Sequence, residues 1–199
     1  MPSQSASGDP TPTAAGARGL RGESSLSPMA RSQARARAGG QVAAMAFPPG
    51  EWELLTHLPA RVIVAATSAE PDGPRRTVAE GLAGLDAIAA GRAFDSDLVR
   101  AVVSAIYAEA DDDRPTAEEF TDRAAGLAEV LEACRRATDV LAARADPADS
   151  AAYRQWVQSV AARVCGAARS GGVLGLGGEQ VSAAERRFLD DLAVALALA

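Results

Sequence analysis

Apolar residues recur at intervals of three and four throughout residues 47–199, in alanine-rich segments bounded by helix caps or by glycine and proline. This spacing places them on one face of an α-helix, whereas the alternation typical of half-buried strands is almost absent. Alanine, the strongest helix former, occupies 47 of the 199 positions. The sequence therefore predicts an all-α fold, a single helical bundle of about six helices.

Caps and helix breakers divide this region into the expected helices. Capping boxes, in which a Ser or Thr side chain and a Glu three residues later bond each other's backbone amides, begin at Thr116 and Ser182. Pro59 is expected to kink the first helix or to start its second half. The expected helices span about residues 51–69, 75–90, 96–106, 116–145, 147–167 and 182–198.

The apolar spacing also predicts which side chains of two helices face the core. Along 116–145 a heptad-like stripe calls for a partner helix, and it consists of Phe120, Leu127, Leu131, Cys134, Thr138 and Leu141. Along 147–167 the inward residues are expected to be Tyr153, Trp156, Val157, Val160 and Val164.

Residues 1–46 have no aromatic side chain and consist mainly of Ala, Ser, Gly, Pro and Arg. Such a segment buries too little apolar surface to offset chain entropy, so we expect a disordered tail before a domain at 47–199. Five Arg against two acidic residues give the tail a charge of +3, which leaves −9 for the domain. Translation from Met29 or Met45, an organelle-targeting segment and an arginine arm stay open as alternatives to a solvated tail.

Composition excludes several functional classes. One His and two Cys are too few for a disulfide scaffold, a zinc finger or a site that needs several imidazoles. The hydrophobic stretches contain too many polar residues to span a membrane. The Arg residues are scattered and lack interleaved aromatic residues, which gives little support for nucleic-acid binding. We therefore expect a cytoplasmic protein without a cofactor, and no catalytic residue is identified.

Five glycines fall within the eight residues 171–178. A phosphate-binding loop would need a following Lys with Ser or Thr, or a preceding strand, and the chain contains no Lys. Glycine permits backbone conformations that are closed to other residues. We expect Val173, Leu174 and Leu176 to fold back on the bundle or to contact a partner, and we predict these three as the partner-binding residues.

The aromatic residues, the single histidine and the two cysteines are the remaining candidates for a pocket, a metal site or a reactive group. Tyr107, Tyr153 and Trp156 are candidates for a pocket between helices, which an enzyme would require. His57 is the only imidazole, so a di-metal centre of the ferritin type is excluded. Cys134 and Cys165 lie on apolar faces and are expected to be buried, unreactive thiols.

The C-terminal third carries a recognisable pattern: Tyr153-x-x-Trp156, then Gly171-Gly172-x-Leu174-Gly175-x-Gly177-Gly178, then Val181-Ser182-x-x-Glu185. It resembles the C-terminal signature of a family of small uncharacterised bacterial all-helical proteins, for which no activity is assigned. Phe47, Glu51-Trp52 and Leu54-Leu55 resemble that family's usual start, so the likeness covers residues 47–199. It implies the same all-helical fold.

The stretch from Val181 to Glu185 is also similar, more distantly, to TerB-like tellurite-resistance proteins. In those helical bundles an Ala-Asp-Gly turn leads into a Ser-x-x-Glu helix start and supplies acidic metal ligands. Here the Asp is missing, so Glu185 alone could be carried over as a metal ligand, and its place in a capping box explains it without metal.

Together these features predict a protein that acts by association, as an interaction or self-association module. Because alanine contributes little buried volume per residue, a second copy could be needed to bury enough surface, and a homodimer is one expectation. The alternatives are a cation-binding, stress-related module of the TerB type and an enzyme with a pocket between helices.

Overall fold

The computed structural model describes residues 45–70, 74–109, 122–167 and 181–198. Within these ranges the chain forms six α-helices and one 3-10 helix and contains no strand, so the predicted all-α fold is confirmed. The helices are α2 (Pro49–Ser68), α3 (Pro74–Ala90), the 3-10 helix η1 (Gly91–Ala93), α4 (Asp97–Ile106), α5 (Arg123–Arg144), α6 (Pro147–Gly166) and α7 (Ala183–Ala195). Residues 1–44 lie outside the described residues, so the tail stays a prediction.

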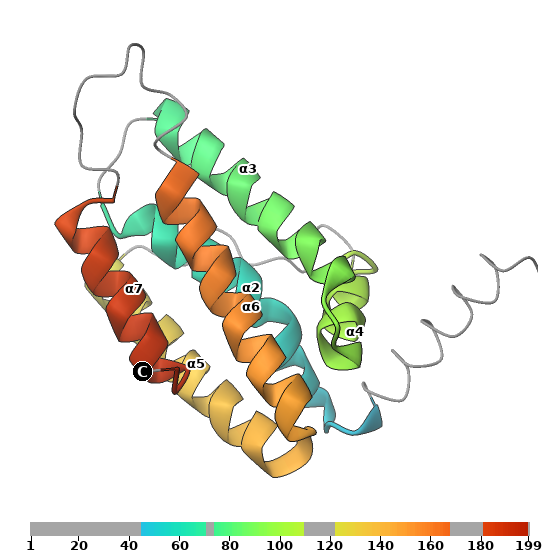
Figure 1. Ribbon diagram of the computed structural model, residues 1–199. Coiled ribbons are helices and arrows are strands. Elements are labelled where there is room, and N and C mark those ends of the chain that lie inside the picture. Colours follow the sequence, from blue (N-terminus) through green and yellow to red (C-terminus); the bar gives the residue numbers. More distant parts are fainter. Residues whose placement is uncertain (1–44, 71–73, 110–121, 168–180, 199) are drawn as a thin grey trace, which may run out of the picture.

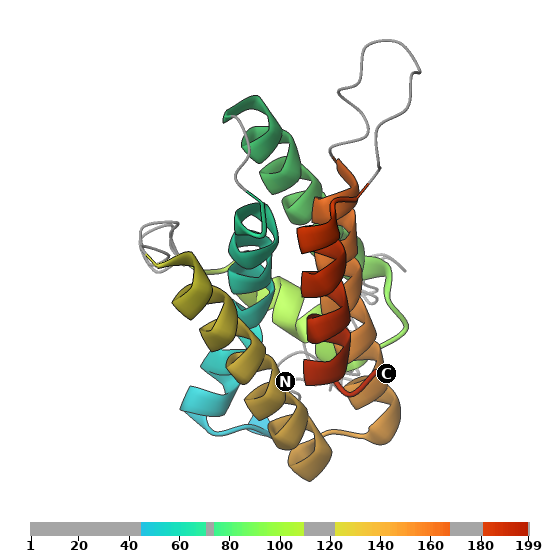
Figure 2. The same ribbon diagram turned by 90° about the vertical axis from the view of Figure 1, so that its left-hand side faces the viewer.

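Helices α2 and α6 pack against each other and form the centre of the bundle (Figure 1). Helices α3 and α4 pack against this pair on one side, and α5 and α7 pack against it on the other. In the turned view, α7 runs alongside α6 (Figure 2). The bundle therefore has two flanks that share one central pair of helices.

Side-chain caps begin four of these helices. Ser96 accepts a hydrogen bond from the Val99 amide at the start of α4, and Asp146 caps α6. At the start of α7 the predicted capping box is formed in both directions between Ser182 and Glu185. These caps satisfy amides that have no partner inside the helix.

The expected start of the longest helix needs a correction. Described helix α5 begins after Asp122, whose backbone is extended at φ −110° and ψ 108° and whose carboxylate accepts from the Ala125 amide. The capping box predicted at Thr116, together with Phe120, lies outside the described residues. A helix running unbroken from 116 is therefore wrong, because an extended residue interrupts it at Asp122.

Helix α2 continues through Pro59, so a second helix does not start there. Proline has no amide hydrogen, and the carbonyl of Leu55, four residues earlier, lacks its usual helical donor. The buried hydroxyl of Tyr153 on α6 donates to that carbonyl at 2.7 Å. A tertiary hydrogen bond thus replaces the helical one that Pro59 removes.

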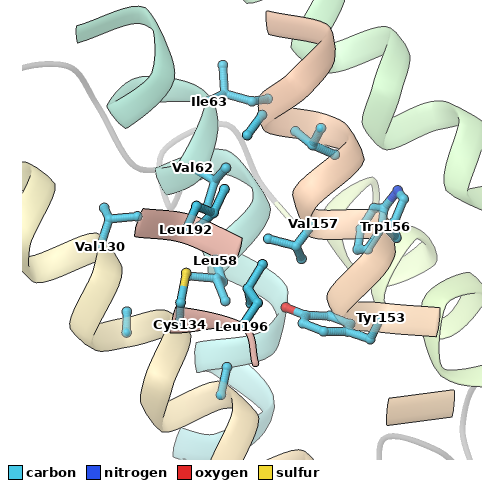
Figure 3. Close-up of a cluster of buried hydrophobic side chains, with 14 of the residues drawn as sticks. Leu58, Val62, Ile63, Val130, Cys134, Tyr153, Trp156, Val157, Leu192 and Leu196 are labelled. Atoms are coloured by element: carbon cyan, nitrogen blue, oxygen red, sulfur yellow. The ribbon is translucent and has the colours of Figure 1, made fainter. Parts of the chain in front are cut away.

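In one part of the core, side chains of α2, α5, α6 and α7 point toward one another (Figure 3), and α3 and α4 add further buried residues, among them Ile88 and Val102. On α6 all five residues predicted to face inward are buried. On α5 the buried face is turned relative to the predicted stripe: Leu127, Leu131 and Thr138 are only half-buried. The buried positions there are Gly126, Val130, Ala133, Cys134, Ala137 and Leu141. Small residues at the contact let α5 approach the bundle closely, which spacing alone does not reveal.

Candidate functional site

Helix α3 has an inner face that is closely packed on the central pair of helices. A Cβ added at Gly84 would lie 2.7 Å from side-chain carbons of Ile63 on α2, and one at Gly91 would lie 2.7 Å from the indole nitrogen of Trp156 on α6. Ala87 and Ile88 on the same face are buried. Glycine at these two positions therefore lets α3 and the start of η1 approach their neighbours.

The opposite face of α3 is also apolar. Val78, Leu82 and Leu85 are exposed by 63%, 59% and 54%, and the next position of the same spacing is the half-buried Ala89. We call these four residues the outer strip. Between Val78 and Leu85 the only charged residue is Glu80, whose side chain is buried. An exposed helix face without charge over two turns is unusual on a monomer, where such faces normally carry polar residues.

A hollow of about 70 Å³ adjoins the outer strip between α2, α3 and the C-terminal end of α4. Its lining residues are Thr56, His57, Ala60, Leu85, Ile88, Ile106, Tyr107 and Glu109. Leu85 belongs to both the strip and the hollow, so the two form one continuous apolar surface. A hollow of this size accepts a single aliphatic or aromatic side chain rather than a large ligand.

The polar groups of the hollow are engaged with their neighbours. The Nε2 atom of His57 lies 3.4 Å from a carboxylate oxygen of Glu109, and the Thr56 hydroxyl donates to the carbonyl of Glu53. The guanidinium of Arg92 lies 4.1 Å from the centre of the Tyr107 ring, a cation–π contact. This arrangement offers an apolar wall with polar and charged groups at its rim.

The three aromatic residues predicted to share a pocket are separated in the structure. Tyr107 lines the hollow and is 46% exposed, whereas Tyr153 and Trp156 are fully buried. Their rings meet edge to face at 5.8 Å, and the Trp156 indole donates to the carbonyl of Ala87. Tyr153 and Trp156 are therefore core residues that join helices, and of the three predicted residues Tyr107 lines the hollow.

Burial also determines the ionisation of the groups near this core. Burial raises the pKa of the Cys134 thiol to about 12, while Arg135 and Arg61 act in the opposite direction. The pKa of the Tyr153 hydroxyl is raised well above its ordinary value by burial and, to a smaller extent, by Cys134. A neutral, buried Cys134 agrees with the expectation of an unreactive thiol.

Glu185, the one candidate for a metal ligand, is buried, and its carboxylate accepts a hydrogen bond from the Ser182 amide at 2.6 Å. Among the described residues no group of three or more His, Cys, Asp or Glu side chains is arranged to hold a metal. The geometry of Glu185 is that of a helix cap.

Val173, Leu174 and Leu176, the predicted contact residues, lie outside the described residues, so their role stays a prediction. The residues that the sequence analysis missed are those of the outer strip. A signal for them exists: Val78, Leu82, Leu85 and Ala89 follow the 4-3-4 spacing of a coiled-coil seam. The pattern is hard to recognise in the sequence because α3 has a second apolar face, and the two sets of apolar residues overlap along the same segment.

No family model matches the chain, and searches of curated proteins and of solved structures gave no significant match. The two resemblances described above therefore stay predictions. Within the part of the chain that the structure describes, no helix has the length and apolar character needed to cross a membrane.

Proposed function

We propose that this protein is an interaction module and that the outer strip of α3, with the adjoining hollow, is its contact surface. The single observation that carries the proposal is the exposure of Val78, Leu82 and Leu85 along one uncharged face. Leaving such side chains in water is unfavourable by about 1 kcal/mol or more each, and a partner that covers them recovers that free energy.

The shape of the hollow supports the same function. Helices commonly dock by placing a few large side chains, spaced by three or four residues, into an apolar groove. The outer strip supplies the groove wall, and the hollow beside Leu85 supplies a place for one such anchor. The pair of His57 and Glu109 at the rim would favour correctly oriented partners.

Site-specific photo-crosslinking in the full chain tests the proposal. A photoreactive phenylalanine analogue is placed at Leu82 and, as a matched control, at Val194, which is similarly exposed on α7. In cells that make the protein, we expect a discrete cross-linked product from position 82 and none from position 194. Equal or absent cross-linking at both positions would remove the proposal.

The other predicted functions have less support. Glu185 serves as a cap, so no observation favours a cation site. Of the three aromatic residues predicted for an enzyme pocket between helices, Tyr107 alone lines the hollow. A cytoplasmic location stays a prediction. The glycine-rich loop stays a second predicted contact, which exchange of Leu174 and Leu176 for Asp would test by loss of association.

A further inference from the structure

The outer strip has the spacing of a helix that pairs with another helix. Val78, Leu82, Leu85 and Ala89 follow one another at intervals of four, three and four, which are the intervals of core positions in a coiled coil. Helix α3 runs along the outer edge of the bundle (Figure 1). The strip is thus a helix-pairing seam on an accessible face.

We propose that the occupant of this seam is a second copy of the same chain, with the two α3 helices antiparallel about a two-fold axis between Leu82 and Leu85. The inference rests on the proposed function and names its partner. Three arguments support it: the complementarity of the strip with itself, the area of the patch, and the absence of charge along it.

Self-complementarity favours the antiparallel arrangement. With the axis midway between Leu82 and Leu85, each Leu82 faces the other copy's Leu85, beside which lies the hollow. Each copy then inserts Leu82 into the partner's hollow, and each Val78 lies against the small Ala89. A parallel pair would instead oppose identical residues, leaving two hollows unfilled and two alanines facing each other. A two-fold interface requires this kind of reciprocal match.

The area of the patch agrees with what a dimer needs. At the observed exposures Val78, Leu82, Leu85 and Tyr107 present an apolar patch on the order of 400 Å². A standard interface covers about 800 Å² on each partner, of which somewhat over half, about 450 Å², is apolar. The strip and the hollow together therefore supply nearly all the apolar surface of one standard interface.

The lack of charge on the strip favours a second copy of this chain. The whole chain carries a formal charge of −6, so two copies repel each other wherever acidic residues meet. From Val78 to Leu85 no exposed residue is charged, so this stretch of two strips meets without burying an unpaired charge, and the exposed Asp86 follows it directly.

Sedimentation velocity of the full chain over a range of concentrations tests the inference. We expect a species of twice the 20.3 kDa chain mass, and Leu82→Gln should raise its dissociation constant by about a hundredfold or more, because the change acts in both copies. Val194→Gln removes an equally exposed apolar side chain elsewhere and should leave the dimer intact. Circular dichroism of both variants should match the native chain, showing that the bundle is folded.

Disulfide trapping tests the orientation. Full-length chains with Leu82→Cys and with Leu85→Cys are mixed under oxidising conditions, while the native Cys134 and Cys165 stay buried. The antiparallel pair predicts a disulfide between the two different variants. A product formed mainly by two Leu82→Cys chains would overturn the antiparallel arrangement.

Two results would overturn self-pairing altogether: a native chain that sediments as a monomer at every concentration, or a dimer that Leu82→Gln leaves unchanged. If the chain is monomeric yet Leu82 still cross-links to another protein in cells, the proposed function holds and only self-pairing is wrong. If Leu82 gives no cross-link and no dimer forms, both proposals are wrong.

Discussion

The two flanks of the bundle are built from similar alanine-rich helices, yet they differ in how far their apolar side chains are buried. On the flank of α5 and α7, the side chains that face the core include Cys134, Leu141 and Leu192, which are fully buried. On the flank of α3 and α4, the inner face of α3 is buried while Leu82 and Leu85 remain more than half exposed.

The difference follows from what each helix carries on its outward face, because both α5 and α3 contact three other elements. The outward face of α5 is charged, for example at Glu132 and Arg135, whereas that of α3 carries Leu82 and Leu85. One apolar face per helix is enough to close a bundle, and α3 carries two. The closed flank therefore holds the fold together, and the open flank is available for recognition.

The largest effect on stability is expected for Trp156→Ala in the central helix α6. The side chain is fully buried and its indole donates to the carbonyl of Ala87, so we expect the free energy of unfolding to fall by about 3–5 kcal/mol. Tyr107→Ala on the open flank should cost less than about 1 kcal/mol, because that ring is half exposed. Urea denaturation of both variants checks the contrast, which would disappear if the two losses were equal.

Alkaline pH should weaken the closed flank through Cys134. Its folded-state pKa of about 12 lies above the ordinary value of 9.0, so above pH 9 the unfolded chain releases a proton that the folded one retains. Stability contributed by the neutral thiol is complete below pH 9 and is lost between pH 9 and 12, by about 1 kcal/mol per pH unit. When the free energy of unfolding is measured at increasing pH, it should fall less steeply for Cys134→Ala than for the native chain. Parallel curves for the two proteins would disprove this assignment.

The hydrogen bond between Tyr153 and the carbonyl of Leu55 should depend on Pro59. We expect Tyr153→Phe to cost about 1–3 kcal/mol, because it leaves a buried carbonyl without a donor. In a Pro59→Ala background the new amide can donate to the same carbonyl, so the same change should cost about 1 kcal/mol less. A double-mutant cycle by chemical denaturation measures this coupling, and a coupling of zero would refute it.

Two glycines of α3, one in contact with Ile63 and one with open space beside it, allow the same substitution to be compared at a packed and an unpacked position. Gly84→Ala would bring a methyl group to 2.7 Å from the buried Ile63 and should destabilise the fold by about 1–3 kcal/mol. Gly81→Ala finds nothing within 4 Å and should stabilise the helix by about 0.5–1 kcal/mol. The melting temperatures of the two variants, measured at a protein concentration too low for dimerisation, compare the two effects. Shifts of the same sign would show that the inner packing of α3 is looser than described.

The smallest effect on folding is expected for Leu82→Ala. Because this side chain is 59% exposed, its removal should change the free energy of unfolding of the monomer by no more than about 0.5 kcal/mol. Association should nevertheless weaken, which separates recognition from stability on this flank. A loss of several kcal/mol in dilute solution would mean that Leu82 belongs to the core.

Much of the local structure could be predicted from the sequence. The caps at Ser96, Asp146 and Ser182 act within one helical turn, so the sequence alone indicates them. The helical class and the inward face of α6 follow from the spacing of apolar residues. The start of α5 was misplaced, since Thr116 with Glu119 forms a complete capping pattern in the sequence, whereas Asp122 is followed three residues later by Ala125.

The candidate site could be predicted only in part. Tyr107 was expected to line a pocket, and it lines the hollow. Tyr153 and Trp156 are also aromatic residues on helices, yet they lie in the core. An aromatic side chain gives the same pattern in a pocket wall and in a core. Its polar atom distinguishes the two roles, and the partner of that atom is distant in sequence, as Leu55 is from Tyr153.

By itself, then, the sequence determined where most helices begin, which residues are compatible with burial, and that the described part of the chain contains helices alone, because these depend on interactions within a few residues. Only the tertiary structure decided which of the two apolar faces of α3 is covered, how Pro59 is accommodated, and where the hollow lies. Those outcomes depend on contacts between helices far apart in the chain, where a glycine or an alanine at the crossing determines how closely two helices approach.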